Sequence, residues 1–169
     1  MTPIALLRAI ASIGVHGKLV TPHLLKEINA AGQPGEDNYH PAEMYENTLG
    51  QSVSLTHEQD EAVVKAMWSV VNEAGTATSI RKDGFDIAGK TGTAQVVGLG
   101  KDVGENKDHS WFVSYAPAFK PEIAVLALIE NSGFGSRYAA PAARAVYDEY
   151  FEKARTSDPL PEIAQLPEQ

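Results

Sequence analysis

The sequence predicts an α+β fold in which helices cover one antiparallel sheet of three strands. Apolar residues follow a helical spacing in two segments before residue 76, alternate after Gly84, and return to a helical spacing near the C-terminus. The connections between the three extended segments are short, so consecutive strands should pair antiparallel. With 169 residues, the chain is long enough to form one domain with its own core.

The first helix should begin after Thr2, whose side chain suits an N-cap, with Pro3 as the first helical residue. Gly17 is expected to end it. Residues 19–28 are expected to be extended and to pair with another segment. Residues 29–54 are rich in Gly, Pro, Asn, Asp and Glu, so they should be mostly loop, with room for one short strand.

The second helix has the clearest pattern. Thr56 and Gln59 match a capping box at its start, and Gly75 should end it. The residues expected to face the core share one helical stripe: Val63, Val64, Met67, Val70, Val71 and Ala74.

Three strands are expected next, over residues 85–97, 110–116 and 122–130. The third is apolar almost throughout, which predicts a strand buried on both faces. Residues 98–109 form a polar loop that is too long for a tight hairpin. Alternation in the second strand assigns one face to Trp111, Val113 and Tyr115, and the other to Phe112 and Ser114.

A final helix is predicted over residues 140–155. Its apolar side should consist of Ala143, Val146, Tyr147, Tyr150 and Phe151. Residues 156–169 include three prolines and are expected to be a disordered tail, so the domain should comprise residues 1–155.

Composition excludes several classes of function. The net charge of −8 argues against a nucleic-acid groove, which needs a basic stripe. No run of 18 apolar residues and no signal peptide occur, so the chain is expected to be soluble and to lack a targeting segment. Without cysteine there are no disulfides, zinc thiolate sites or thiol nucleophile. The five histidines lack metal-ligand spacing, and neither a metal nor a cofactor is expected.

Residues 84–91 match the nucleotide-binding P-loop pattern letter for letter, from Gly84 to the Gly89-Lys90-Thr91 end. A P-loop follows a buried strand and opens a helix, because backbone amides and the helix dipole hold the phosphates. Here the preceding residues are polar and the following ones form strands better than helices. A nucleotide-binding site therefore remains a weak alternative.

The same stretch suits Lys-Thr-Gly on a strand, a motif of penicillin-interacting serine enzymes. An ammonium at Lys90 would supply positive charge beside a nucleophile. Gly92 would let a peptide lie close to the strand and pair with its edge. The amide of Thr93 could then point at a developing oxyanion.

Four segments together resemble the class B penicillin-binding proteins, most closely the penicillin-binding protein 2 type of elongation transpeptidases. Besides 86–95 around the Lys-Thr-Gly motif, they are 2–11, 67–77 and the stretch 108–133. The resemblance covers residues 2–152 and implies the C-terminal portion of a transpeptidase domain. It also implies the penicillin-binding and serine β-lactamase-like fold, with three of the five main strands present.

The resemblance further implies a D-alanyl-D-alanine transpeptidase that cross-links peptidoglycan stem peptides through a serine acyl-enzyme and binds β-lactams. Lys90 would then be a catalytic residue. Thr91, Gly92 and Thr93 would bind substrate, and the Thr93 amide would form half of the oxyanion hole. The implied parent is anchored in the inner membrane, with this domain in the periplasm or outside the cell membrane, and works with a membrane glycosyltransferase.

The sequence departs from the family pattern in two motifs, Ser-x-x-Lys and Ser-x-Asn, which should precede Lys90. The only Ser-x-x-Lys, Ser79 to Lys82, lies in a polar stretch expected to be loop, and Tyr45-x-Asn47 precedes it in the wrong order. No nucleophile is therefore assigned, and the chain alone is expected to be inactive. A non-catalytic binding module is the main alternative.

Two further expectations concern the surroundings of the strand. His109, next to Asp108, opens the second strand and could line the cleft, although a structural loop-end histidine is the simpler interpretation. Because two strands of the family sheet are missing, an exposed sheet edge could favour self-association.

Overall fold

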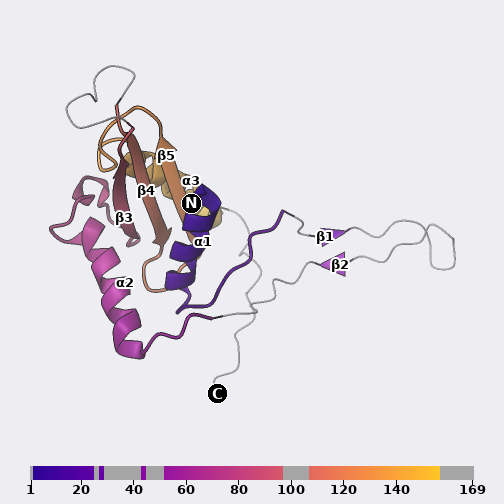
Figure 1. Ribbon diagram of the computed structural model, residues 1–169. Helices are drawn as coiled ribbons and strands as arrows, with labels where there is room; N and C mark the ends of the chain where they lie inside the picture. The colour runs from indigo at the N-terminus through magenta and orange to yellow at the C-terminus, as the bar shows by residue number, and fades with distance from the viewer. Residues whose placement is uncertain (1, 25–26, 29–42, 45–51, 97–106, 157–169) are drawn as a thin grey trace.

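The computed structural model describes residues 2–24, 27–28, 43–44, 52–96 and 107–156 (Figure 1). A three-stranded sheet lies between one helix on its front face and another behind it, and a further helix flanks its first strand. The main elements are α1 Pro3–Gly14, α2 His57–Asn72, the 3-10 turn η1 Thr78–Ile80, β3 Ala88–Ala94, β4 His109–Ala116, β5 Ile123–Ile129 and α3 Ala139–Thr156. The predicted α+β class is confirmed.

Both predicted helix starts are confirmed by their capping contacts. The Thr2 hydroxyl accepts a hydrogen bond from the backbone N–H of Ala5 at 3.4 Å. Thr56 and Gln59 form the full capping box, each side chain bonding to the other's backbone at 3.3 and 3.0 Å. The helical residues of α1 end at Gly14, and a turn closed by Gly17 N–H donating to the Ser12 carbonyl follows.

The sheet has the order β3-β4-β5 with antiparallel pairing throughout, as the sequence predicts. Lys90 lies opposite Val113 and Gly92 opposite Trp111. The two predicted faces of β4 are also confirmed. Phe112 packs with α3 residues, whereas Tyr115 packs with residues of α1 and α2.

The core consists of two clusters, one on each face of the sheet. The larger cluster lies between the sheet and α3, and its buried members include Val71, Ile87, Phe112, Ala140, Ala143 and Tyr147. The smaller cluster lies under α1 and α2 and consists of Met67, Ala88, Tyr115 and Ala118. Only Ser12 and Gly14 of the apolar helix α1 are buried, so α1 covers its face of the sheet incompletely.

The first strand is shorter than predicted, because it begins at Ala88 instead of residue 85. Its partner β4 ends at Ala116, and Pro117 has no N–H with which to continue the ladder. The Phe85 ring instead packs at a tilt against Phe151 of α3, with ring centroids 4.4 Å apart. Phe85 and Ile87 both pack into the larger core cluster, so their apolar character reflects this packing and not a strand over residues 85–87.

Three burial predictions are wrong in part. Strand β5 is half-buried instead of fully buried, because it forms an edge of the described sheet and α1 covers it only partly. On α3, Val146 is 47% exposed, since the face that packs on the sheet is centred on Ala143 and Tyr147. Val63 at the rim of the α2 stripe is likewise exposed.

The segment before α2 contains the short pairing that the sequence predicts. Strand β1 Glu27–Ile28 pairs antiparallel with β2 Glu43–Met44. The proposed tail lies beyond Thr156, outside the described residues.

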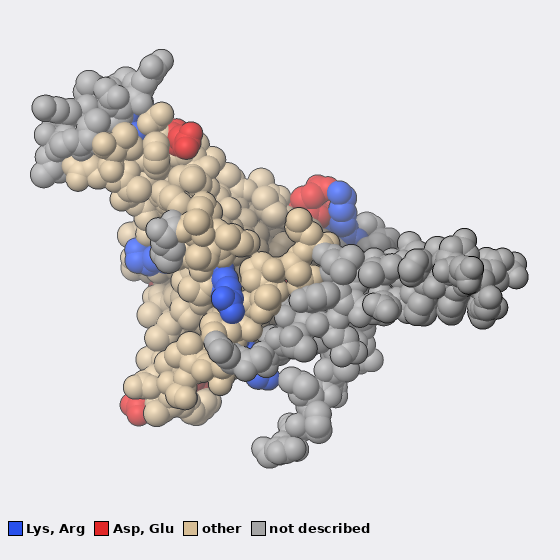
Figure 2. All heavy atoms as spheres, turned by 45° about the vertical axis from the view of Figure 1, so that its right-hand side comes forward, with Lys and Arg blue, Asp and Glu red and all other residues tan. Residues whose placement is uncertain are grey.

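Within the described part of the chain, no helix is long and apolar enough to cross a membrane. In Figure 2, the described part of the visible face is mostly uncharged, with separate charged groups and no continuous basic patch.

Candidate functional site

The Lys-Thr-Gly-Thr segment lies in the middle of β3, which is an edge strand of the described sheet. Lys90 is exposed, and its ammonium donates a hydrogen bond to the Thr91 carbonyl at 2.8 Å. Gly92 is half-buried and Thr93 is exposed. The segment thus combines a cation, two hydroxyls and a strand edge in one place, as a peptide-binding site requires.

A hollow of about 400 Å³ lies beside this segment on the α1 side of the sheet. Its floor is apolar, formed by Leu6 and Ile10 of α1 and by Trp111 and Val113 of β4. Residues 90–94 form the wall along β3. The Lys90 ammonium is therefore the cationic group at the rim of an otherwise apolar concavity.

The hydroxyl of Thr91 is engaged by the loop that follows α2. The Oγ1 atoms of Thr76 and Thr91 lie 2.7 Å apart. Thr91 is predicted to bind substrate, and the structure adds a partner that fixes the rotamer of its side chain. The Thr93 side chain makes no such contact with Thr76. Thr93 instead lines a second hollow, which lies farther along the strand.

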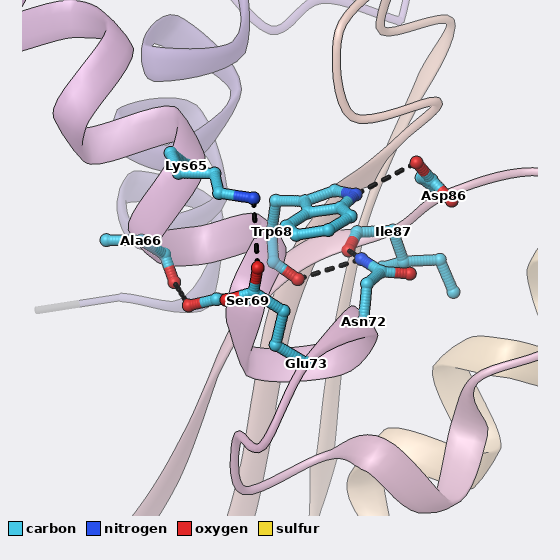
Figure 3. Close-up of polar contacts among 8 residues, drawn as sticks. All are labelled: Lys65, Ala66, Trp68, Ser69, Asn72, Glu73, Asp86 and Ile87. Atoms are coloured by element: carbon cyan, nitrogen blue, oxygen red, sulfur yellow. Dashed lines mark hydrogen bonds and ion pairs between the residues drawn. The ribbon is translucent and has the colours of Figure 1, made fainter.

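Helix α2 fixes the approach to β3 through two polar side chains (Figure 3). The Trp68 indole N–H donates to the Asp86 carboxylate at 2.9 Å. The Asn72 amide donates to the Ile87 carbonyl at 2.9 Å and to the Trp68 carbonyl at 2.8 Å. Because Ile87 immediately precedes β3, these bonds hold the strand that contains Lys90 in place.

The loop between β5 and α3 lies against the far end of β3. A Cβ on Gly135 would be 2.5 Å from the Gly92 carbonyl oxygen and 2.3 Å from that of Trp111, so the loop backbone rests directly on the strands. A second hollow of about 230 Å³ lies here, between Thr93 and the loop residues Gly133, Phe134, Arg137 and Tyr138.

Residues 1–148 match the family described as the penicillin binding protein transpeptidase domain. The chain belongs to this family. Among curated relatives, it is 36% identical to the peptidoglycan D,D-transpeptidase MrdA of Haemophilus influenzae, over 90% of this chain and 24% of that protein. It is 34% identical to MrdA of Acinetobacter baumannii, over 94% of this chain and 23% of that protein. The chain therefore spans about a quarter of the length of these relatives.

Solved structures agree with this family. The chain aligns with penicillin-binding protein 2 of Pseudomonas aeruginosa, in complex with WCK 5153, at a TM-score of 0.67 and 34% identity. That alignment covers 89% of this chain and 30% of the other chain. A Helicobacter pylori complex of penicillin-binding protein 2 with MreC aligns at 0.61 and 27% identity, covering 89% and 25% of the two chains. The expected partial transpeptidase fold is thereby confirmed.

Three stretches of this chain match sequence motifs of other sites: the P-loop pattern, Ser-x-x-Lys and Tyr-x-Asn. Lys90 and Thr91 lie inside a strand that continues to Ala94, so the P-loop interpretation is wrong, because no helix amino terminus follows them. Ser79 is exposed on η1, and the Lys82 ammonium lies 3.5 Å from the Asp148 carboxylate of α3. The Tyr45-x-Asn47 match lies outside the described residues.

Asp148 lies in the middle of α3 and forms ion pairs with both Arg144 and Lys82. The Arg144 guanidinium donates to the Asp148 carboxylate at 2.7 and 3.0 Å. These hydrogen bonds and the charges of Arg144 and Lys82 lower the pKa of Asp148. Lys82 is therefore paired with α3, and the expectation that Ser79 is not a nucleophile stays a prediction.

His109 has a structural partner at the start of β4. Its Nδ1 accepts a hydrogen bond from the backbone N–H of Asn131 at 3.0 Å, which links β4 to the loop after β5. Asp108, not His109, lines the hollow beside Thr93. A cleft role for His109 stays a prediction.

Sequence reasoning missed four residues that shape the site: Asn72, Thr76, Gly135 and Arg137. Asn72 alone had a local signal, since it is a polar residue in the last turn of an amphipathic helix. The other three act across the fold, where spacing along the chain gives no signal. Among the described residues, no group of three or more His, Asp or Glu side chains is placed to hold a metal ion.

Proposed function

We propose that this chain supplies the substrate-binding strand of a peptidoglycan D,D-transpeptidase longer than the chain itself. The observation that carries the proposal is the Lys90-Thr91-Gly92-Thr93 segment on an edge strand, beside an apolar hollow, within the penicillin-binding transpeptidase family. The curated relatives named above are D,D-transpeptidases, which supports the same reaction here.

In the proposed reaction, a serine hydroxyl outside this chain attacks the carbonyl carbon of the penultimate D-alanine of a stem peptide. The terminal D-alanine leaves with a proton, and an amine of a neighbouring stem peptide then displaces the serine. The donor peptide adds as a strand to the edge of β3, where Gly92 keeps the approach open. The Thr93 amide stabilises the oxyanion, while Thr91 and Thr93 bind the substrate carboxylate.

Lys90 contributes positive charge next to the attacking serine. Its side chain is exposed and bonds only locally, so its removal should leave the fold unchanged. In the complete transpeptidase, Lys90→Ala is expected to slow acylation by a reporter penicillin roughly 100-fold. Intact-protein mass spectrometry measures this rate, and Lys120→Ala, at an exposed lysine between β4 and β5, is the control. Equal acylation rates for Lys90→Ala and wild type would exclude the assigned role.

The chain alone is proposed to be inactive. The same mass measurement on this chain should show no added mass after incubation with the reporter penicillin. A stoichiometric increase that maps to the peptide containing Ser79 would instead make that serine the nucleophile. A non-catalytic binding module would give no added mass either, but then Lys90→Ala would not alter acylation of the complete protein.

The partners and location of the complete protein follow from the same proposal. Stem peptides and β-lactams would bind along β3. One structural neighbour is an acyl-enzyme of penicillin G with penicillin-binding protein A of Mycobacterium tuberculosis, which supports β-lactam binding; it aligns at a TM-score of 0.61 and 25% identity over 89% of this chain and 32% of that one. We further propose an inner-membrane anchor, a periplasmic position for this domain and a membrane glycosyltransferase as partner.

An incomplete sheet has a consequence for the isolated chain. Strand β5 forms one edge of the described sheet, and α1 leaves Ile4 55% exposed. Unpaired strand edges and apolar helix surface favour association. We therefore expect the isolated chain to self-associate through this side. Light scattering that reports a monomer at high concentration would contradict this expectation.

A further inference from the structure

We infer that Arg137 is a specificity-determining residue that binds a carboxylate of the peptide held on β3. This inference rests on the proposed function, because it assumes that a peptide pairs with the edge of β3. The observation that motivates it is the second hollow, which joins the Thr93 side of the strand to the loop between β5 and α3.

The loop that contains Arg137 is firmly positioned. The backbone N–H groups of Ser132 and Gly133 both donate to the Asp108 carbonyl, at 3.1 and 2.7 Å. The Ser132 hydroxyl lies 2.8 Å from the hydroxyl of Ser110 on β4. The loop is thus bonded to the start of β4 on both backbone and side-chain atoms, so its shape does not depend on a ligand.

The same loop is pressed onto the substrate strand at Gly135. The backbone distances there leave no space for a side chain. Two further bonds define the next turn: Arg137 N–H donates to the Phe134 carbonyl at 3.0 Å, and Ala140 N–H donates to the Gly135 carbonyl at 2.9 Å. Because Arg137 follows Gly135 by only two residues, the backbone places it beside Thr93.

The charge of this hollow suits an anion. The chain has a net charge of −8, yet the described residues that line the hollow include two cations, Lys107 and Arg137, and one acid, Asp108. The carboxylate of Asp108 already accepts a hydrogen bond from the Val96 N–H at 3.2 Å. In the part of the chain that the structure describes, Arg137 forms no ion pair, and its guanidinium lies 5.7 Å from the ring centroid of Tyr138.

Guanidinium groups bind carboxylates through two parallel N–H···O bonds, which gives geometric selectivity as well as affinity. The ligand class is therefore a peptide carboxylate, next to the hydroxyl of Thr93. Two carboxylates of a stem peptide could occupy this position: the terminal carboxylate of D-Ala-D-Ala, or a side-chain carboxylate of a diamino-diacid at the third residue. The chemistry is the same, and the test separates them.

The test titrates the ¹⁵N-labelled chain with three probes and follows the amide signals of β3. The probes are diacetyl-L-Lys-D-Ala-D-Ala, its C-terminal amide, and the amide in which 2,6-diaminopimelate replaces lysine. The variants are Arg137→Gln, Arg137→Lys, and Lys120→Gln as a control at a distant exposed lysine. Unchanged spectra outside the loop establish that each variant is folded.

Arg137→Gln is expected to weaken binding of at least one carboxylate probe about tenfold, with Arg137→Lys intermediate and Lys120→Gln unchanged. A loss confined to the first probe identifies the terminal carboxylate, and a loss confined to the third identifies the side-chain carboxylate. Equal losses for all three probes, or no loss for any, would overturn the assignment of Arg137 while leaving the substrate strand in place. Failure of all three probes to shift β3 in the wild type would overturn the proposed function and this inference together.

Discussion

The hydroxyl oxygens of Thr76 and Thr91 lie 2.7 Å apart and join the loop after α2 to strand β3. The contact joins two elements, because Thr76 follows α2 and Thr91 lies in β3. Thr91 was assigned to substrate binding from the motif alone. Its contact with Thr76 means that the hydroxyl is already oriented before any ligand arrives.

This contact predicts a coupled pair. Thr76→Val and Thr91→Val should each lower the free energy of unfolding by about 0.5–1.5 kcal/mol, because each removes the same hydrogen bond. The double variant should cost little more than either single variant. Urea denaturation measures all three, and Thr78→Val on η1 is the matched exposed control. Additive losses would show that the two hydroxyls do not interact.

Asn72 is predicted to stabilise the start of β3. The side chain is 8% exposed, and its amide bonds to the buried Ile87 carbonyl. Asn72→Ala would leave that carbonyl unpaired, so the free energy of unfolding should decrease by about 1–3 kcal/mol. Hydrogen exchange should also accelerate at the amides of Ala88 and Lys90 before it does on α3.

The control for Asn72 is Ser69→Ala on the same helix. The Ser69 hydroxyl bonds only to the Ala66 carbonyl within its own turn, so its loss should change stability by less than about 0.5 kcal/mol. If both variants have equal effects on β3 exchange, the bond from Asn72 to Ile87 does not position the strand.

The sequence correctly predicted the features that depend on residues close together in the chain. The capping box at Thr56 and the alternation on β4 were read correctly, because each depends on residues within one element. Phe85 was misassigned to a strand. Its spacing fits alternation, but the ring packs against Phe151, and only the fold brings α3 to that position.

Of the candidate site, only the residues of the Lys-Thr-Gly-Thr motif could be predicted from the sequence. Lys90 and Thr93 were found because the family places them in one short segment. Gly135 could not be found in this way, because its importance comes from resting on Gly92, 43 residues earlier in the chain. A sequence shows where a glycine lies, but it does not show which backbone atoms of the folded chain leave no space there for a side chain.

Gly135→Ala is predicted to displace the loop from the strands. The added Cβ would meet the carbonyl oxygens of Trp111 and Gly92 at 2.3 and 2.5 Å, and neither can move without disturbing the sheet. The free energy of unfolding should decrease by about 1–3 kcal/mol. The amide signals of Gly92 and Trp111 should shift, although the substitution is remote from both in sequence.

Gly133→Ala separates crowding from backbone strain in the same loop. Gly133 has a φ of +99° and nothing within 4 Å of an added Cβ. Its substitution should therefore strain the local backbone and leave the signals of Gly92 and Trp111 unchanged. If Gly133→Ala shifts them as strongly as Gly135→Ala does, contact of Gly135 with the strands is not what holds the loop.

Tyr115 is predicted to limit stability at alkaline pH. It is fully buried, and its hydroxyl has no hydrogen-bond partner among the described residues. Burial, with a smaller contribution from the charge of Asp60, raises the pKa of Tyr115 to about 12 from 10.0. The unfolded chain therefore loses this proton first, so stability is full below pH 10 and decreases as the pH rises toward 12.

Tyr115→Phe should remove the part of this decrease that comes from Tyr115, while Tyr147, whose pKa burial also raises, should contribute a separate decrease. At pH 7 the variant should match or slightly exceed the wild type in stability, because the lost hydroxyl has no bond to break. Above pH 10 the difference in its favour should increase, as measured by urea denaturation at pH 7, 10 and 11. Tyr147→Phe provides the contrast, because its hydroxyl lies 2.8 Å from that of Ser114 and its loss should cost about 1 kcal/mol at pH 7. A Tyr115→Phe variant that loses stability in parallel with the wild type above pH 10 would show that ionisation of Tyr115 is not coupled to unfolding.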